Sequence, residues 1–545
     1  MMRWGIHMFL LMSLLGCGPT GEMAGPPVTG TVYPSPRRAT WMEEVRVTIP
    51  WTSRSTPAAK LAEVPLEVRT EPAPSGAGSV VIFKVPDNFW GGPQNFEIVE
   101  GANRVTGSLT VLGQTVFEQP EPEALAVIQP SVPDSGFEQK IADGGLRVVP
   151  FSGGSKSVPL GGRSGPCAGR LVRVARDPAR LTSPVSIGAL LERLEQSGGS
   201  SVVDVDGVLG IDPVSGHDLD PTILTDPSPN TKPINARTAV KARQGSNYTG
   251  VGATIAVVDS GVSNLTGLTL RSGGADFVNP DTPNPLQDEY TQGGVVVGHG
   301  TAAAVLAAHA TYGIAPGAGI LPIKSCDKDG KCRLEAVIRG ICHAVAYAEK
   351  NPQEQLVLNL SLGSDTPSEI VYIILKDALM KRGVNGISVV AAAGNDWAIR
   401  SSKSGVLHHF PASFGGNRGL SVRREPGRSM AVLKGLFSVG AVGDYSGTLR
   451  VSGFSGQGDF VDLVAPGERV LSLSPAGSPR EYTGTSFAAP IVSGAVAVIR
   501  QATSLVPLTP EALELAFLAN YTNPTTLGAP EEAQGRGLLD LTRAP

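Results

Sequence analysis

Residues 253–262 read ATIAVVDSGV, an uninterrupted apolar run that ends in an aspartate, a serine and a glycine. Two further apolar runs lie C-terminal to it, at residues 355–360 and 387–393, and stretches rich in small helix-forming residues separate them. A strand that is apolar on both faces suits a parallel sheet buried between helices. The pattern therefore predicts an α/β domain over residues 235–545, with a parallel sheet covered by helices on both faces.

The overall composition limits the classes of protein that fit this chain. Of its 545 residues, 41% are hydrophobic and 17% are charged, which is enough apolar material for a large core and excludes wholesale disorder. The net charge is −4, so the electrostatic footprint of a nucleic-acid binder is missing and we expect no nucleic-acid partner. Five cysteines are too few for a disulfide-dense scaffold.

The N-terminus has the features of an export signal. Arg3 is followed by the apolar run at residues 8–15, so we interpret residues 1–16 as a signal peptide. This run is too short to span a bilayer, which takes about 20 residues. It ends in LLGC, which resembles the lipobox of bacterial lipoproteins, and that resemblance implies lipidation of Cys17. An ordinary signal peptide with a coincidental cysteine, or a wrongly assigned start, is the alternative.

Short β-type runs follow the signal. Residues 17–28 are rich in glycine and proline and are interpreted as a tether. Residues 29–113 alternate between polar and apolar positions, with turn residues between the runs, which is typical of a small β-sandwich. This region resembles Ig-like IPT/TIG domains in its spacing, and we expect a spacer or a binding module. Residues 114–167, rich in proline, glycine and serine, are interpreted as a linker.

The next region is more regular. Residues 168–213 contain a strand pattern at 170–175, helical spacing at 186–196 and two more strand-like runs. A β-α-β-β order just before a larger domain resembles the prosegments of proteases, although a fixed structural domain is an equally good interpretation. A second linker is expected at residues 214–234.

Two polar segments follow apolar strands in the C-terminal domain. Asp259 stands at the carboxyl end of its strand, the edge at which open α/β sheets build their sites, although an aspartate there can equally be a helix cap. Asn395 ends the segment AAGN, and its NH₂ group can point at a developing negative oxygen. His299 lies between two glycines in VGHGT, which leaves its imidazole uncrowded.

The segment at residues 482–490, YTGTSFAAP, carries a candidate nucleophile. Gly484 allows a sharp entry into a helix, and Ser486 then lies at the helix N-terminus, where backbone N–H groups and the dipole favour an oxyanion. The segment lacks the G-x-S-x-G elbow, which excludes an α/β-hydrolase.

Taken together, the segments DSG, GHGT, AAGN and GTSFAAP resemble those of the subtilisin-like serine proteases (subtilases), in the same Asp-His-Ser order. The resemblance covers residues 235–545. It implies a subtilisin-like fold and a serine endopeptidase that cleaves proteins through an acyl-enzyme, with Asp259, His299 and Ser486 as the triad. Asn395 and the Ser486 N–H group would form the oxyanion hole. A catalytically idle surface binding protein of the same fold is the alternative.

The same resemblance implies a specificity pocket. His409 stands where the family commonly has a small residue, so we expect a shortened or more polar pocket that prefers small or acidic side chains. The residues expected to line the substrate cleft are Ser361, Leu362, Gly363, Ala392, Ala393 and Gly394.

Cysteine positions and expected partners complete the prediction. Cys326 and Cys332 close a short polar loop, and in an exported protein we expect them to form a disulfide. Cys342 is interpreted as a buried core residue and Cys167 as part of a linker. We expect no cofactor for the chemistry and assign no metal ligand, while structural calcium is left open.

We expect protein or peptide substrates and an exported enzyme. It would be held at the cell envelope through Cys17 or secreted after processing, with membrane contact only through that anchor. The oligomeric state is left open.

Overall fold

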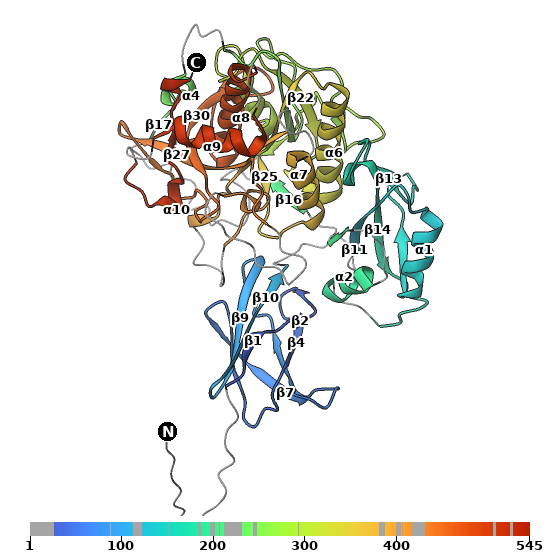
Figure 1. Cartoon of the computed structure of the whole chain (residues 1–545). Coiled ribbons are helices and arrows are strands. Elements are labelled where there is room, and N and C mark those ends of the chain that lie inside the picture. The colour runs from blue at the N-terminus through green and yellow to red at the C-terminus, as the bar shows by residue number, and fades with distance from the viewer. Residues whose placement is uncertain are drawn as a thin grey trace, which may run out of the picture.

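The computed structural model contains a small β-rich unit, an α+β unit and a large C-terminal unit (Figure 1). It describes residues 27–87, 89–112, 123–151, 153–183, 187–196, 202–205, 208–211, 231–242, 248–292, 294–380, 387–398, 405, 407–416, 431–504, 508–523 and 527–544. Within this described part of the chain, every helix falls short of the length and apolar character that a bilayer crossing requires.

The β-rich unit, here called the sandwich unit (residues 27–112), consists of two sheets that share one apolar core. One sheet has the order β1-β10-β9-β5-β6 with β3 on β10, and the other has the order β2-β4-β8-β7. Its strands are β1 (Thr29–Thr31), β2 (Pro34–Ser35), β3 (Arg38–Ala39), β4 (Glu44–Ile49), β5 (Ala58–Leu61), β6 (Val64–Leu66), β7 (Val68–Pro72), β8 (Ser79–Lys84), β9 (Gly92–Glu100) and β10 (Asn103–Val111). Alternate residues of β4, such as Val45 and Val47, are fully buried against Phe83 and Phe96, as a half-exposed strand requires. The expected β-rich architecture is therefore present, and the Ig-like resemblance stays a prediction.

The α+β unit (residues 123–205) corrects the expectation of a linker at residues 114–167. Its sheet has the order β12-β14-β11-β15, and β13 also pairs with β14. The elements are β11 (Glu123–Ile128), α1 (Asp134–Asp143), β12 (Leu146–Val149), β13 (Val158–Pro159), the 3-10 helix η1 (Pro166–Ala168), β14 (Arg170–Arg176), α2 (Ile187–Gln196) and β15 (Val202–Val205). Phe137 and Ile141 of α1 share a core with Leu146 and Val172 of the sheet. In residues 123–167, few apolar side chains mark the strands and helices. The frequent prolines and glycines between them therefore hid the secondary-structure pattern in the sequence.

The large unit (residues 231–544) is built on an 11-stranded sheet of order β19-β22-β18-β24-β26-β27-β29-β33-β32, with β17 and β28 on β27. Neighbours from β19 to β33 are parallel, whereas β17, β28 and β32 are antiparallel, so the sheet is mixed rather than wholly parallel. The sheet strands are β17 (Thr231–Lys232), β18 (Ala253–Asp259), β19 (Ala275–Asp276), β22 (Gly319–Lys324), β24 (Gln355–Leu360), β26 (Ser388–Ala392), β27 (Leu436–Tyr445), β28 (Thr448–Val451), β29 (Leu463–Pro466), β32 (Thr522–Asn523) and β33 (Leu538–Leu539).

Two apolar layers cover this sheet, one on each face. Ile255 and Val257 of β18 face a cluster formed with α5, α8 and α9, whereas Ala256 and Val258 face a cluster formed with α6 and α7. This alternation explains why the strand is apolar at every position. The helices are α4 (Ala236–Ala239), α5 (His299–Ala308), α6 (Leu334–Lys350), α7 (Glu369–Met380), η4 (Ala412–Phe414), α8 (Thr485–Ala502), α9 (Pro510–Asn520), α10 (Glu531–Gln534) and η6 (Leu541–Arg543).

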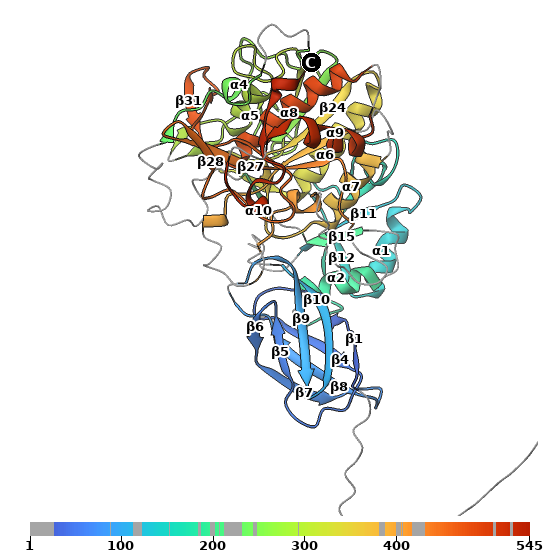
Figure 2. The ribbon, with the colours of Figure 1, turned by 60° about the vertical axis from the view of Figure 1, so that its left-hand side comes forward.

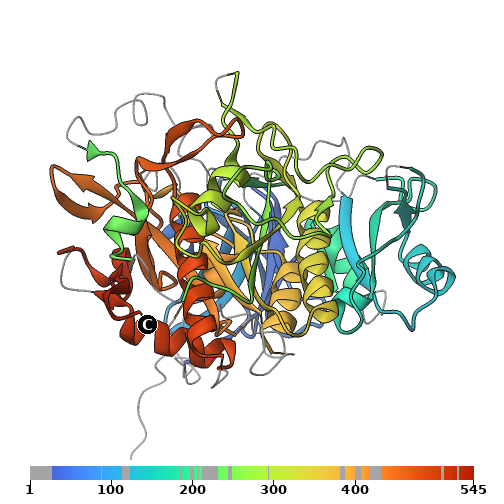
Figure 3. The same ribbon diagram turned by 90° about the horizontal axis from the view of Figure 1, so that it is seen from above.

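Helices α5 and α8 pack very closely on one face of the sheet. A side chain at Gly494 of α8 would place its Cβ 2.6 Å from the Ala307 carbonyl oxygen of α5 and 2.9 Å from Ile314 Cβ. Glycine at this position therefore sets how near the two helices lie. Figure 3 shows α8, in red, running beside the sheet, with the α+β unit in cyan at the opposite side of the molecule.

Small strands outside the main sheet complete the cleft region. They are β16 (Val208–Ile211), β20 (Thr291–Gln292), β21 (Val295–Val296), β23 (Lys331–Arg333), β25 (Leu362–Gly363), β30 (Val470–Leu473) and β31 (Pro479–Tyr482). The strand that follows the α+β unit, β16, leaves that unit and forms a three-stranded sheet with β23 and β25 of the large unit.

The sandwich unit also contacts the large unit. Arg38 Nη2 lies 2.5 Å from Glu369 Oε2 on α7, and the Gly91 N–H group donates to Asp365 Oδ2 at 3.1 Å. Figure 2 shows β9 and β10 reaching toward the large unit. The three units are therefore in contact rather than separated by free linkers.

Candidate active site

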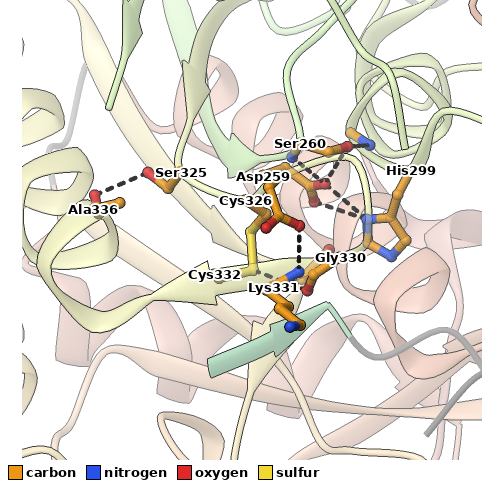
Figure 4. Close-up of a disulfide and its surroundings, with 12 residues drawn as sticks. Asp259, Ser260, His299, Ser325, Cys326, Gly330, Lys331, Cys332 and Ala336 are labelled. Carbon is orange, nitrogen blue, oxygen red and sulfur yellow. Dashed lines mark hydrogen bonds and ion pairs between the residues drawn. A yellow bond between two sulfur atoms is a disulfide. The ribbon is translucent and has the colours of Figure 1, made fainter. Parts of the chain in front are cut away.

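An aspartate and a histidine from neighbouring elements form a hydrogen-bonded pair. Asp259 ends β18, and His299 is the first residue of α5. His299 Nδ1 lies 2.8 Å from Asp259 Oδ1 and 3.0 Å from Oδ2, and both side chains are fully buried (Figure 4). The structure thus brings these two residues, both named in the sequence analysis, together.

A second buried carboxylate supports this pair. The Ser260 hydroxyl donates to Asp288 Oδ1 at 2.8 Å and lies 3.2 Å from Asp259 Oδ1. The Thr301 N–H group, in the first turn of the helix that carries His299, donates to Asp288 Oδ2 at 2.7 Å. Burial raises the pKa of Asp288. Sequence reasoning missed this residue, because an aspartate in a loop carries no distinguishing signal.

Ser486 is the second residue of α8, directly after Gly484 and Thr485. Gly484 has a φ of 148°, a conformation that favours glycine and permits the sharp entry into the helix. The next residue, Phe487, has its ring centroid 5.0 Å from that of His299, so the start of α8 lies beside the imidazole.

The hydroxyl of Ser486 donates to the Ser361 carbonyl oxygen at 3.2 Å. Among the described residues, His299 Nε2 is buried and has no hydrogen-bond partner. Of the two hydrogen bonds expected within the triad, the bond between Asp259 and His299 is formed and the bond between His299 and Ser486 is not. A catalytic hydrogen bond is often absent before substrate binds and forms only in the complex, so this geometry is compatible with a poised site.

A polar network fixes the start of α8 against the neighbouring strands. The Ser361 hydroxyl donates to the Ser486 carbonyl oxygen at 2.7 Å and accepts from Asn359 Nδ2 at 2.9 Å. Asn359 Oδ1 in turn accepts from the Ser493 hydroxyl at 2.9 Å. Ser361, expected beside the substrate, therefore holds the first turn of α8 through its side chain.

Asn395 follows β26 and faces the same helix start. Its Oδ1 accepts from the Thr485 N–H group at 2.8 Å and from the Thr485 hydroxyl at 3.1 Å. Both bonds use the amide oxygen and hold Asn395 against the first residue of α8. The structure thus brings Asn395 and the segment that carries Ser486 together.

The cleft lies between β23 and β25, and β16 occupies it as an antiparallel partner of both. Gly210 pairs with Lys331 on one side and with Gly363 on the other, and Ile211 pairs with Leu362. A peptide that adds a strand between two edges is a common mode of peptide recognition. The chain's own segment is therefore held between two strands of the large unit in the way that such a peptide is held.

A small pocket of about 10 Å³ lies beside the end of β26. Its lining residues are Ala393, Gly394, Asp396, Leu407, His409, Gly456, Gln457 and Phe460. A Cβ on Gly363 would lie 2.2 Å from His409 Nε2, and one on Gly394 would lie 2.6 Å from His409 Cγ, so the imidazole fills the space between these two backbones. Burial lowers the pKa of His409 to about 4, which keeps the ring neutral at pH 7. Ala392 is buried within β26 and is absent from the pocket lining.

The structure contains two disulfides. The predicted Cys326–Cys332 bond is confirmed, and it closes a loop whose Cys326 N–H group donates to the Asp259 carbonyl oxygen at 3.1 Å (Figure 4). Cys342 is buried as expected, but it is bonded to Cys167, which corrects the interpretation of these two residues as core and linker. Counting could have found this bond, since with Cys17 set aside four cysteines remain to pair.

Across the described residues, no three histidine, cysteine, aspartate or glutamate side chains gather in a way that could hold a metal ion. Structural calcium therefore stays an untested expectation. Cys17 lies outside the described residues.

Comparison with known proteins supports the interpretation of the site. The model of the subtilase family matches residues 250–537. Subtilisin E of Bacillus subtilis (strain 168) is 35% identical over 253 residues, which cover 46% of this chain and 56% of that protein. Subtilisin of Bacillus pumilus is 34% identical over 253 residues, which cover 46% of this chain and 78% of that protein. This chain thus spans little more than half the length of the first of these relatives.

A solved structure shares the fold. The crystal structure of fervidolysin from Fervidobacterium pennivorans, described as a keratinolytic enzyme related to subtilisin, superposes with a TM-score of 0.53 at 21% sequence identity. The superposition covers 79% of this chain and 62% of that one. At this level of identity the likeness concerns the fold alone.

Proposed function

Because this chain belongs to the subtilase family, we propose that it is a serine endopeptidase whose nucleophile is Ser486. The observation that carries the proposal is the buried Asp259–His299 pair at 2.8 Å beside the N-terminus of the helix that presents Ser486. A neutral hydroxyl is a weak nucleophile, so a base oriented by a carboxylate is the chemistry that this arrangement supplies.

The reaction follows from these positions. The Ser486 hydroxyl turns from the Ser361 carbonyl to His299 Nε2, attacks the peptide carbonyl and gives its proton to the imidazole. Asp259 holds the ring and stabilises the imidazolium, while Asn395 and the Ser486 N–H group stabilise the oxyanion. His299 then protonates the leaving amine, and water hydrolyses the acyl-enzyme by the reverse proton path.

The test is reaction with a fluorophosphonate probe and turnover of a fluorogenic peptide. Ser486→Ala should abolish labelling and lower kcat by about 10⁶-fold. Ser504→Ala, at an exposed serine just beyond the C-terminal end of the same helix, is the matched control and should still be labelled. A parent chain that neither reacts with the probe nor cleaves any peptide after its cleft has been cleared would favour an idle binding protein.

We propose that residues 208–211 imitate a substrate and that activation requires their removal from the cleft. The pairing of β16 with both edges of the cleft supports a prosegment rather than a fixed structural domain. N-terminal sequencing of active enzyme tests it. A new start between Ile211 and Thr231 supports processing there, whereas an intact chain at full activity contradicts it.

The pocket is proposed to accept small, uncharged side chains at the residue before the cleaved bond. The neutral ring of His409 fills the pocket, and Asp396 in its lining disfavours the acidic side chains that were an equal expectation from the sequence. In a peptide library, alanine should exceed phenylalanine at this position. His409→Gly should change that ratio toward phenylalanine by about 10-fold or more, because each added or lost group in a pocket changes specificity by 10-fold to 200-fold. A parent profile led by phenylalanine or glutamate would contradict the assignment.

Export and a lipid anchor at Cys17 are proposed on two grounds. The signal-like start precedes the cysteine, and two disulfides suit an oxidising compartment. Cys17→Ala should move the protein from the detergent phase to the soluble fraction, and an unchanged distribution would contradict the anchor.

A further inference from the structure

A covalent bond connects the chain on the two sides of the strand that fills the cleft. Cys167 in η1 is bonded to Cys342 in α6, 175 residues later. Strand β16 lies between the two cysteines in sequence. A backbone cut on the C-terminal side of β16 and before β17 therefore opens a closed loop, and it does not divide the protein into separate molecules.

Non-covalent contacts surround the bond. Arg173 Nη2 of β14 lies 2.8 Å from Glu335 Oε2 of α6, and each side chain is only 16% exposed. The Arg163 N–H group and the Ser164 hydroxyl both donate to the Glu349 carboxylate, at 2.8 and 3.1 Å. Apolar residues of the α+β unit, including Leu125 and Leu171, belong to the same core cluster as α6 and α7. The bond thus crosses a packed interface.

The bond is also shielded from solvent. The exposed fractions of Cys167 and Cys342 are 1% and 0%. A dissolved thiol reaches such a disulfide only when the interface opens, so the bond is placed to persist after processing.

We propose that the Cys167–Cys342 bond keeps the α+β unit and β16 attached to the peptidase after the chain is cut between Ile211 and Thr231, so that β16 remains an intramolecular inhibitor. The proposal rests on the proposed function and adds its regulation. A tethered segment acts at an effective concentration of about millimolar order, which does not fall on dilution. Full clearance of the cleft then needs a second backbone cut between Cys167 and β16 or opening of the bond.

The experiment uses the full chain with a recognition sequence for a site-specific protease placed between Ile211 and Thr231. The parent and the Cys167→Ala/Cys342→Ala variant are cut completely. Both are then diluted in steps over about 1,000-fold, a range that distinguishes a tethered from an untethered inhibitor. Turnover of a fluorogenic peptide per mole of enzyme is then measured. The uncut parent and the uncut cysteine variant, in which β16 is still joined to the large unit through the backbone, are the matched controls.

Dilution should activate the cut untethered variant as its N-terminal fragment dissociates, and it should leave the cut parent and both uncut chains inhibited. Half-activation of the parent should need a competing peptide at a concentration roughly 10²-fold to 10⁴-fold higher than the variant needs. A parent that activates on dilution to the same extent as the variant overturns the proposal.

A second readout does not depend on activity. In the Ser486→Ala background, the amides of β23 and β25 should stay protected from hydrogen exchange after cutting and dilution when the bond is present. They should lose protection when the cysteines are replaced. Loss of protection in both chains contradicts the tether, whereas protection without peptidase activity in the Ser486-containing variant contradicts only the proposed function. If the alanine pair does not fold, Cys167→Ser/Cys342→Ser takes its place.

Discussion

Asn395 is held through its amide oxygen, and its NH₂ group is the donor that we propose for the oxyanion. The oxygen accepts from the N–H group and hydroxyl of Thr485. Asn395→Ala should lower kcat by about 10²-fold to 10³-fold with little change in KM, since the donor acts only in the transition state.

Asn395→Asp is the matched control for a structural role. It keeps the oxygen that holds Thr485 but has no NH₂ donor, so it should be as impaired as the alanine variant. Recovery of the parent's kcat in the aspartate variant would mean that Asn395 matters only for holding α8.

The residues that we propose for the chemistry could be found in the sequence because each belongs to a recognisable local motif. Asp259, His299, Asn395 and Ser486 all lie where their segments indicated. Asp288 was not predictable, because its partners Ser260 and Thr301 come together only when the loop folds over the start of α5. The direction of the Ser486 hydroxyl could not be predicted either, because a side-chain rotamer depends on the surrounding packing.

At the scale of an element, α9 carries a buried acid. Glu514 is fully buried, its Oε2 accepts from the Gly435 N–H group, and burial raises its pKa from 4.5 to about 7. Between these values the folded protein binds more protons than the unfolded chain. The contribution of Glu514 to stability is thus complete below pH 4.5 and is lost as the pH rises through 7.

Glu514→Gln should remove this loss. The difference in the free energy of unfolding between pH 4.5 and pH 8 should shrink by on the order of 3 kcal/mol, as followed by denaturant titration at each pH. Glu532→Gln, at an exposed position, is the control and should follow the parent. An unchanged slope in Glu514→Gln would show that this carboxyl does not couple folding to pH.

The short disulfide loop that ends in β23 gives a second prediction. Cys326→Ser/Cys332→Ser should lower the free energy of unfolding by about 2 kcal/mol, the entropic estimate for so small a loop. Because Cys332 lies in β23, one edge of the cleft, KM should rise more than kcat falls. Peptide kinetics beside thermal unfolding check both parts, and a loss confined to kcat would be the contrary result.

Elements were predictable to the extent that their apolar residues are periodic and continuous. The strands at β14, β18 and β24 appear within a residue or two of the expected ranges, and so does helix α2. The elements from α1 to η1 were hidden, because α1 buries two side chains and β12 and η1 bury one each, with proline and glycine between them.

At the scale of the whole molecule, the sandwich unit is attached through a partly buried ion pair. Arg38 and Glu369 are 12% and 16% exposed, whereas the Arg46–Glu71 pair within the sandwich is 46% and 41% exposed. A double-mutant cycle with Arg38→Met and Glu369→Gln should give a coupling of about 1–2 kcal/mol, and the same cycle at Arg46 and Glu71 under about 1 kcal/mol. The measurement is the free energy of unfolding in denaturant, and equal couplings at the two pairs would contradict a docked interface.

The arrangement of the three units could not be predicted from the sequence. Contacts between them join residues such as Arg38 and Glu369, or Cys167 and Cys342, that share no local pattern. Only the fold of the large unit, which repeats strand and helix in order, could be predicted from its own residues.

The close approach of α5 and α8 bears on how sequences of this kind can diverge. His299 is the first residue of one helix and Ser486 the second residue of the other, so the gap between the two axes affects the separation of the imidazole and the hydroxyl. A methyl group at Gly494 would force that gap open deep in the core, far from any peptide. Descendants of this chain are therefore free to vary around the cleft and yet are constrained at a position that no substrate ever meets.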